Sequence, residues 1–140
     1  MPTYLKHLIR IGFWPYIIFI INYAAYKLFP LAYDHYNFDN PMHILGGMVA
    51  ALSINYALQL LQKQKTVVIS NLLIKWIFII TAVIAVAVLW EFYEFTSDYF
   101  FGTLHQPTLN DTMKDLFNGM VGAVITCLLF IRNRKLEIKN

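Results

Sequence analysis

The chain alternates between long apolar runs and short polar segments. Its apolar runs are Ile11–Phe29, Met42–Leu61, Ile74–Trp90 and Leu116–Ile131. Within each run the apolar residues are continuous and do not alternate with polar ones as in a β-strand. A helix that crosses a bilayer needs about 20 mostly apolar residues. Within hydrocarbon only helices and closed barrels satisfy their backbone hydrogen bonds, and continuous runs favour helices. The pattern therefore predicts an all-α polytopic membrane protein, a four-transmembrane-helix bundle with spans at about residues 11–29, 42–61, 74–95 and 112–131.

The composition supports lipid as the main solvent. Hydrophobic residues make up 59% of the 140 residues and charged residues only 14%, whereas a soluble domain carries about 25% charged residues. The length suits a single membrane domain over residues 1–140. The first run follows basic residues as a signal peptide does, but it is long, aromatic and without a small-residue cleavage site, so we expect a retained span. Cys127 is the only cysteine, which excludes a disulfide within the chain, and we expect it to be buried.

Basic residues gather on one side of the predicted membrane. Nine of the eleven lysines and arginines fall in the N-terminal segment, in or beside the connection between the second and third spans, or in the C-terminal segment. Cytoplasmic segments carry the excess of lysine and arginine, so both termini are expected in the cytoplasm. The net charge of +3 reflects this sorting and gives no reason to expect a nucleic-acid partner.

Acidic residues gather on the opposite side, although acids contribute little to membrane orientation. Only one of the eight, Glu137, is expected in the cytoplasm. The others include three sets at the outer ends of the second, third and fourth spans, with helical spacings that place each set on one face. These sets are Asp39 with His43; Glu91, Glu94 and Asp98; and Asp111, Asp115 and Asn118. A helix rises only about 10 Å over seven residues, so we expect the three sets to meet in one shallow pocket.

Carboxylates at this depth are costly unless they share protons, stay wet or bind cations. Lys27 and Lys114 are the only basic residues expected on this side, and they cannot neutralise seven acids. Oxygen-rich sites with one imidazole suit divalent Mg, Mn or Ca, and Zn also fits. The predicted metal ligands are Asp39, His43, Glu91, Glu94, Asp111 and Asp115. The candidate catalytic residues are Glu91 and Glu94, one of them as general base; the secondary candidates are Asp98, Asn118, Lys27 and Lys114.

Several of these residues also have a purely structural interpretation. Asp39 and Asp111 would serve only as helix caps that favour the helix dipole. His43 would be a neutral interfacial histidine, and Lys27 would extend its charge to the membrane interface. Because the three acidic sets belong to the other spans, the first span is expected to act as support, with Asn22 bridging helices.

Local signals predict the ends and contacts of the helices. Asn40 followed by Pro41 is typical of a helix start, and Asn110 offers an N-cap for the fourth span. Segments 30–40 and 96–110 are predicted as outer loops. Small residues in the second and fourth spans predict close helix packing in lipid. They are Gly46, Gly47, Ala50, Ala51, Gly119, Gly122 and Ala123.

Three stretches carry a family resemblance: Asp39–His43 followed by Gly46 and Gly47, Leu89–Glu94, and Asp111–Asp115 followed by Gly122 and Ala123. Together they resemble the YjdF-like family of uncharacterised bacterial inner-membrane proteins, and more distantly the VanZ-like proteins. The resemblance covers about residues 30–125. It implies a multi-pass protein of the bacterial inner membrane with polar residues at these positions, and it implies no reaction.

Three functions remain open on the sequence alone. The first is a metal-dependent hydrolase or transferase that acts on a lipid or its headgroup. The second is a non-enzymatic binder or transporter of a cation, a cationic compound or a lipid. The third is a structural membrane factor with a cation-stabilised fold. The expected partner is membrane lipid. A homo-oligomer would supply the additional spans that the resemblance implies for many family members.

Overall fold

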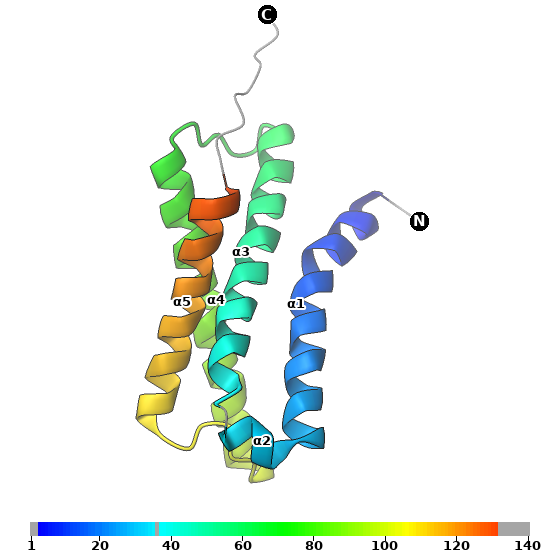
Figure 1. Ribbon diagram of the computed structural model, residues 1–140. Coiled ribbons are helices and arrows are strands. Elements are labelled where there is room, and N and C mark those ends of the chain that lie inside the picture. Colours follow the sequence, from blue (N-terminus) through cyan, green and yellow to red (C-terminus); the bar gives the residue numbers. More distant parts are fainter. Residues whose placement is uncertain (1–2, 36, 132–140) are drawn as a thin grey trace, which may run out of the picture.

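The computed structural model describes residues 3–35 and 37–131, and within them it contains five helices and no strand. The long helices are α1 (Thr3–Leu28), α3 (Asp39–Lys63), α4 (Leu72–Phe101) and α5 (Leu109–Phe130), as Figure 1 shows. A short helix, α2 (Pro30–His35), connects α1 to α3. All four long helices are long and apolar enough to cross a membrane. The predicted all-α bundle of four membrane-spanning helices is therefore confirmed.

The helices extend beyond the apolar runs that predicted them. α4 runs to Phe101 and ends where Gly102 adopts the left-handed backbone angle φ of 64°. The predicted loop from residue 96 therefore begins only after this glycine, which takes that conformation without the strain of a Cβ. The predicted loop at 30–40 is occupied largely by α2 and by the first residues of α3. Only the part of a helix inside the hydrocarbon core must be apolar, and the helix ends can carry polar side chains. Apolar runs alone therefore underestimate helix length.

The starts of α3 and α5 differ from the predicted caps. α3 begins at Asp39, after Phe38, whose backbone is already helical and which offers no side-chain cap, so the prediction of Asn40 as N-cap was wrong. α5 is capped by Thr108, whose side chain accepts a hydrogen bond from the backbone N–H of Asp111 at 3.2 Å. The prediction of Asn110 as N-cap was therefore also wrong. Threonine, two residues before Asn110, is also one of the favoured N-cap residues.

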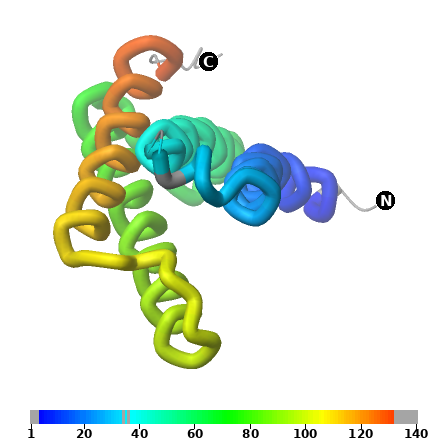
Figure 2. The backbone as a smooth tube through the Cα atoms, turned by 60° about the horizontal axis from the view of Figure 1, so that its bottom comes forward, coloured from blue at the N-terminus to red at the C-terminus, as the bar shows by residue number. Residues whose placement is uncertain are grey.

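α3 is the central helix of the bundle. It packs most extensively on α5 and also contacts α1 and α4, while α4 packs on α5. Figure 2 shows α1 at one edge of the bundle beside α3, with α4 and α5 on the other side. α1 packs mainly on α3. A core of six side chains joins α3, α4 and α5: Ala51, Ile79, Val83, Ala123, Cys127 and Ile131.

Glycines bring the backbones of α3 and α5 into direct contact. A Cβ added at Gly47 would overlap the carbonyl oxygen of Gly119, and one added at Gly122 would overlap that of Ile44. The predicted close packing is confirmed at these positions. Gly46 differs, because nothing lies within 4 Å of a Cβ built there. Adjacent residues point about 100° apart on a helix, so Gly46 faces away from α5.

The charges are sorted along the bundle. α1 begins and α5 ends at the same end, and α2 lies at the opposite one (Figure 1). We call the end with α2 the acidic end, because Asp39 begins α3 there and Asp111 lies in the first turn of α5. The C-terminal charges used to predict orientation (Arg132, Arg134, Lys135, Glu137 and Lys139) lie outside the described residues. Which end faces the cytoplasm stays a prediction.

Candidate functional site

A cavity of about 430 Å³ opens at the acidic end. We call it the acidic cavity; its lining comes from α1 to α5 and from the loop between α4 and α5. Its charged lining residues are Asp39, Glu94, Asp111 and Lys114. Its aromatic lining residues are Phe19, Tyr23, Tyr26, Tyr33, Trp90 and Tyr93. The helix ends at the acidic end thus enclose one pocket, and that pocket has both charged and aromatic walls.

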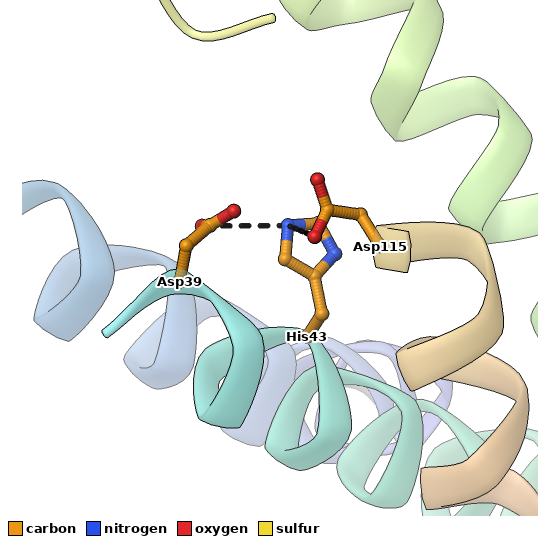
Figure 3. A group of neighbouring side chains, drawn as sticks. All are labelled: Asp39, His43 and Asp115. Atoms are coloured by element: carbon orange, nitrogen blue, oxygen red, sulfur yellow. Dashed lines mark ion pairs between the residues drawn. The ribbon is translucent and has the colours of Figure 1, made fainter. Parts of the chain in front are cut away.

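Three of the predicted metal ligands lie close together beside the acidic cavity. Asp39 and His43 lie one turn apart on α3, and Asp115 reaches them from α5 (Figure 3). The glycine contact explains why they meet, since Gly47 and Gly119 lie four residues after His43 and Asp115 on the same helix faces. One ligand atom from each of the three residues lies within 4.8 Å of the others. We call this group the Asp–His–Asp cluster.

His43 forms long ion pairs with both carboxylates of the cluster, at distances that are also close to those between two ligands of one ion. His43 Nε2 lies 3.5 Å from Asp39 Oδ1 and 3.9 Å from Asp115 Oδ1, whereas a charge-assisted N–H···O bond measures about 2.8 Å. Two ligands of a tetrahedral ion with bonds of about 2.1 Å stand about 3.4 Å apart. Asp115 is 2% exposed, and its Oδ1 has no hydrogen-bond partner among the described residues. A buried acceptor without a partner is costly, so this oxygen makes the cluster a candidate cation site.

Tyr33 holds the outermost ligand of the cluster in place. Its hydroxyl lies 2.6 Å from Asp39 Oδ1 and 2.8 Å from Asn22 Oδ1. Burial, together with the hydrogen bond to the Asp39 carboxylate, raises the pKa of Tyr33 above its ordinary value. The hydroxyl therefore stays protonated and can act as a donor to the carboxylate. This contact connects α1, α2 and α3 at the acidic end.

The two glutamates of α4 lie outside the cluster and have different partners. Glu91 accepts a hydrogen bond from the side-chain amide of Gln106 at 2.5 Å, and its other carboxylate oxygen is buried with no hydrogen-bond partner in the described part of the chain. Glu94 accepts one from the indole N–H of Trp90 at 2.8 Å and lines the acidic cavity. Both residues are 6% exposed. Of the two predicted catalytic residues, Glu94 is therefore the one that faces the space where a ligand fits.

Asp98 has a structural role that the sequence did not indicate. Its carboxylate accepts hydrogen bonds from the backbone N–H groups of His105 and Gln106, at 2.9 and 2.8 Å, and from the hydroxyl of Thr103 at 2.5 Å. It therefore fixes the loop between α4 and α5 instead of joining the cluster. That loop in turn positions Gln106 against Glu91.

The remaining predicted site residues surround the cluster without entering it. Asp111 pairs with Lys114 at 2.8 Å, and both line the acidic cavity. Lys27 lies over the rings of Tyr23 and Tyr26, at 5.9 and 5.5 Å from their centroids. Such cation–π contacts hold the ammonium at the aromatic rim. The side-chain amide of Asn118 donates to Asn40 Oδ1 at 2.9 Å, which joins α5 to α3 beside the cluster.

α1 contributes more than the support that the sequence predicted. Phe19 and Asn22 line the acidic cavity, and Asn22 contacts Tyr33. Asn22 is a polar residue within an apolar span, and this was the signal available in the sequence. Nothing in the spacing of Tyr33 or Gln106 marked them, because their roles depend on α2 and on a loop conformation.

Comparison with known proteins identifies the family. Residues 6–135 match the family model described as predicted membrane protein (DUF2238), and the chain belongs to this family. No curated protein and no solved structure matches the chain.

Proposed function

We propose that this member of the DUF2238 family binds a divalent metal ion at Asp39, His43 and Asp115 and hydrolyses or transfers a phosphoester of a membrane lipid. The observation that carries the proposal is the buried Oδ1 of Asp115, which lies 3.9 Å from His43 Nε2 and has no hydrogen-bond partner within residues 3–35 and 37–131. A divalent cation would give this oxygen a partner. It would also neutralise the two carboxylates, which a low-dielectric site favours.

The ligand set narrows the choice of ion. One imidazole and two carboxylates suit Mn²⁺, Zn²⁺ or Mg²⁺, whereas Ca²⁺ takes six to eight oxygen ligands. Three protein ligands leave a coordination position for water or for a substrate oxygen, as catalytic metal sites require. Asp39 lines the acidic cavity, so that position would face it. These features support a site for catalysis over a closed structural site.

The acidic cavity supplies the other groups that phosphoester hydrolysis needs. A bound divalent cation would polarise the phosphoester and activate a water molecule. Glu94 lines the cavity and is oriented by Trp90, which suits it to accept the proton of that water as the oxygen attacks phosphorus. As the P–O bond breaks, the leaving alkoxide takes this proton from Glu94 and departs as an alcohol. Lys114, also in the lining, would contact the phosphate. For a transferase, a second alcohol takes the place of water.

The cellular setting of the proposal follows from the sequence. The resemblance to the YjdF-like family and the distribution of basic residues support a bacterial inner-membrane protein with both termini in the cytoplasm. The acidic cavity would then face the outer leaflet. Reporter fusions at each terminus test this orientation, and an extracytoplasmic C-terminus would contradict it.

Metal analysis of the purified protein tests the cluster directly. After dialysis against Mn²⁺, Zn²⁺ or Mg²⁺, mass spectrometry of the wild type is expected to find about one ion per chain. Asp115→Asn removes one anionic ligand and should lose most of the ion. Asp111→Asn is the matched control, because it makes the same change one turn earlier on α5, outside the cluster.

The results separate binding from catalysis. A wild type without stoichiometric metal, or an Asp115→Asn variant that retains all of it, would overturn the site. Glu94→Gln is expected to keep the metal and to lose turnover of phospholipid headgroups, measured as released phosphate or alcohol. Bound metal without turnover of any lipid in the wild type would instead favour a cation binder or a structural factor.

A further inference from the structure

A second cavity, of about 160 Å³, lies deeper in the bundle between α1, α3 and α4 and reaches Gly119 of α5. We call it the apolar cavity, because Asn22 and His43 are its only polar lining residues among those described. Its walls are small or aliphatic along α3 and α4, with Gly46 and Ala50 on one side and Val83 and Val86 on the other. This lining suits hydrocarbon and offers little to a polar ligand.

The two cavities adjoin at the Asp–His–Asp cluster. Phe19, Asn22 and Trp90 line both of them, and the rings of Phe19 and Trp90 meet edge to face at 5.5 Å. Asp39 lines the acidic cavity, while His43, four residues later on α3, lines the apolar one. A molecule that occupied both would therefore pass directly beside the cluster.

The apolar cavity also borders the surface that faces lipid. Val86 lines it and is nevertheless 49% exposed. α1 packs mainly on α3, and its apolar side chains Pro15 and Ile18 form the cavity wall opposite α4. Gly46 leaves the interior open, since nothing lies within 4 Å of a Cβ built there. The apolar cavity thus borders the bilayer-facing surface at Val86, from which a hydrocarbon chain would enter without crossing water.

We propose that the apolar cavity binds one hydrocarbon chain of a lipid whose phosphate-bearing headgroup occupies the acidic cavity. The identity of the headgroup rests on the proposed function, whereas the chain site rests on the apolar cavity alone. At about 30 Å³ for each water-sized group, 160 Å³ holds roughly five carbons. The chain carbons nearest the headgroup would be enclosed, and the rest would extend into the bilayer past Val86.

A series of monoalkyl phosphates tests this assignment. The full-length protein, in detergent with Mn²⁺, is titrated with propyl to octyl phosphate, and inorganic phosphate serves as the headgroup alone. Burial of each methylene should tighten binding about fourfold, which corresponds to ~0.8 kcal/mol. We expect this gain to stop after about five carbons, because later carbons leave the cavity.

Substitutions at two glycines supply matched variants. Gly46→Leu places a branched side chain in the cavity and should abolish the dependence on chain length, while Gly46→Ala should end it one or two carbons earlier. Gly12→Leu is the control, since a Cβ at Gly12 also meets nothing within 4 Å and this residue does not line either cavity. Both leucine variants remove a helical glycine, so their effects on helix propensity are similar.

The outcomes separate this inference from the proposed function. Chain-length dependence that is lost in Gly46→Leu and kept in Gly12→Leu supports the chain site, even if binding needs no metal and the proposed function fails. Metal-dependent binding of inorganic phosphate without chain-length dependence overturns the chain site and leaves the proposed function standing. Equal dependence on chain length in wild type and Gly46→Leu also overturns it, because the chain would then bind elsewhere or partition into detergent. Binding of none of these probes overturns both.

Discussion

The contact between Gly47 and Gly119 should control both the stability of the bundle and the geometry of the cluster. In Gly47→Ala, the new methyl group would overlap the Gly119 carbonyl oxygen and lie 2.9 Å from its carbonyl carbon and 3.0 Å from its Cα. Ordinary van der Waals contact begins at 3.4 Å. These neighbours are backbone atoms that cannot rotate away, so α3 and α5 must separate by roughly 1 Å or more to restore normal contact.

The expected cost follows from two opposing terms. Overpacking at a tight contact destabilises by about 1–3 kcal/mol, and the rigid neighbours place this case near the upper value. Replacing glycine by alanine within a helix returns about 1 kcal/mol. The free energy of unfolding should therefore fall by about 2 kcal/mol. Because Gly47 and Gly119 lie one turn from His43 and Asp115, the same separation should weaken metal affinity by about 10- to 100-fold, as changes that displace ligands do.

Gly12→Ala is the matched control for this prediction. A Cβ at Gly12 meets nothing within 4 Å, so this variant should be as stable as the wild type or up to about 1 kcal/mol more stable. Reversible unfolding in mixed detergent micelles, followed by tryptophan fluorescence, gives the stabilities, and Mn²⁺ titration gives the affinities. A Gly47→Ala variant that is as stable as Gly12→Ala and binds Mn²⁺ like the wild type would refute the reasoning.

Two further predictions concern the surroundings of the cluster and its ion. Tyr33→Phe removes the hydroxyl that lies 2.6 Å from Asp39 Oδ1. It should therefore lower the free energy of unfolding by about 0.5–1.5 kcal/mol and the metal affinity by about tenfold. Tyr16→Phe, at an exposed position of α1, is the control and should change neither quantity in the same titrations. Saturation with the correct divalent ion, at about 100 times its dissociation constant, should stabilise the wild type by about 2.7 kcal/mol. Chelator should reverse this gain, and Asp115→Asn should show little of it. A gain of equal size in Asp115→Asn would mean that the ion acts elsewhere.

The helix bundle and part of the candidate site could be predicted from the sequence. Continuous apolar runs predicted four spans because lipid requires every backbone group to be satisfied within a helix. Helical spacing placed Asp39 beside His43 on one face. The small residues after His43 and Asp115 predicted the close approach that brings α3 and α5 together, and Gly47 and Gly119 meet at that position.

The remaining details depend on geometry that spacing does not encode. Glu91, Glu94 and Asp98 share a helix face, yet Glu91 bonds Gln106, Glu94 bonds Trp90, and Asp98 bonds the following loop. A periodic pattern shows which residues can face the same way, but not which partner each carboxylate finds. The roles of Tyr33 and Gln106 arise from a short helix and a loop, and only the three-dimensional structure places them.

The division of labour between helices has a consequence for how such a protein can diversify. The proposed metal ligands come from α3 and α5, whose backbones are in contact and leave little freedom for change. α1 supplies no ligand to the cluster, but with Pro15, Ile18 and Phe19 it forms one wall of the apolar cavity. Mutations in this single helix would therefore change which molecules fit the apolar cavity and leave the proposed metal ligands unaltered.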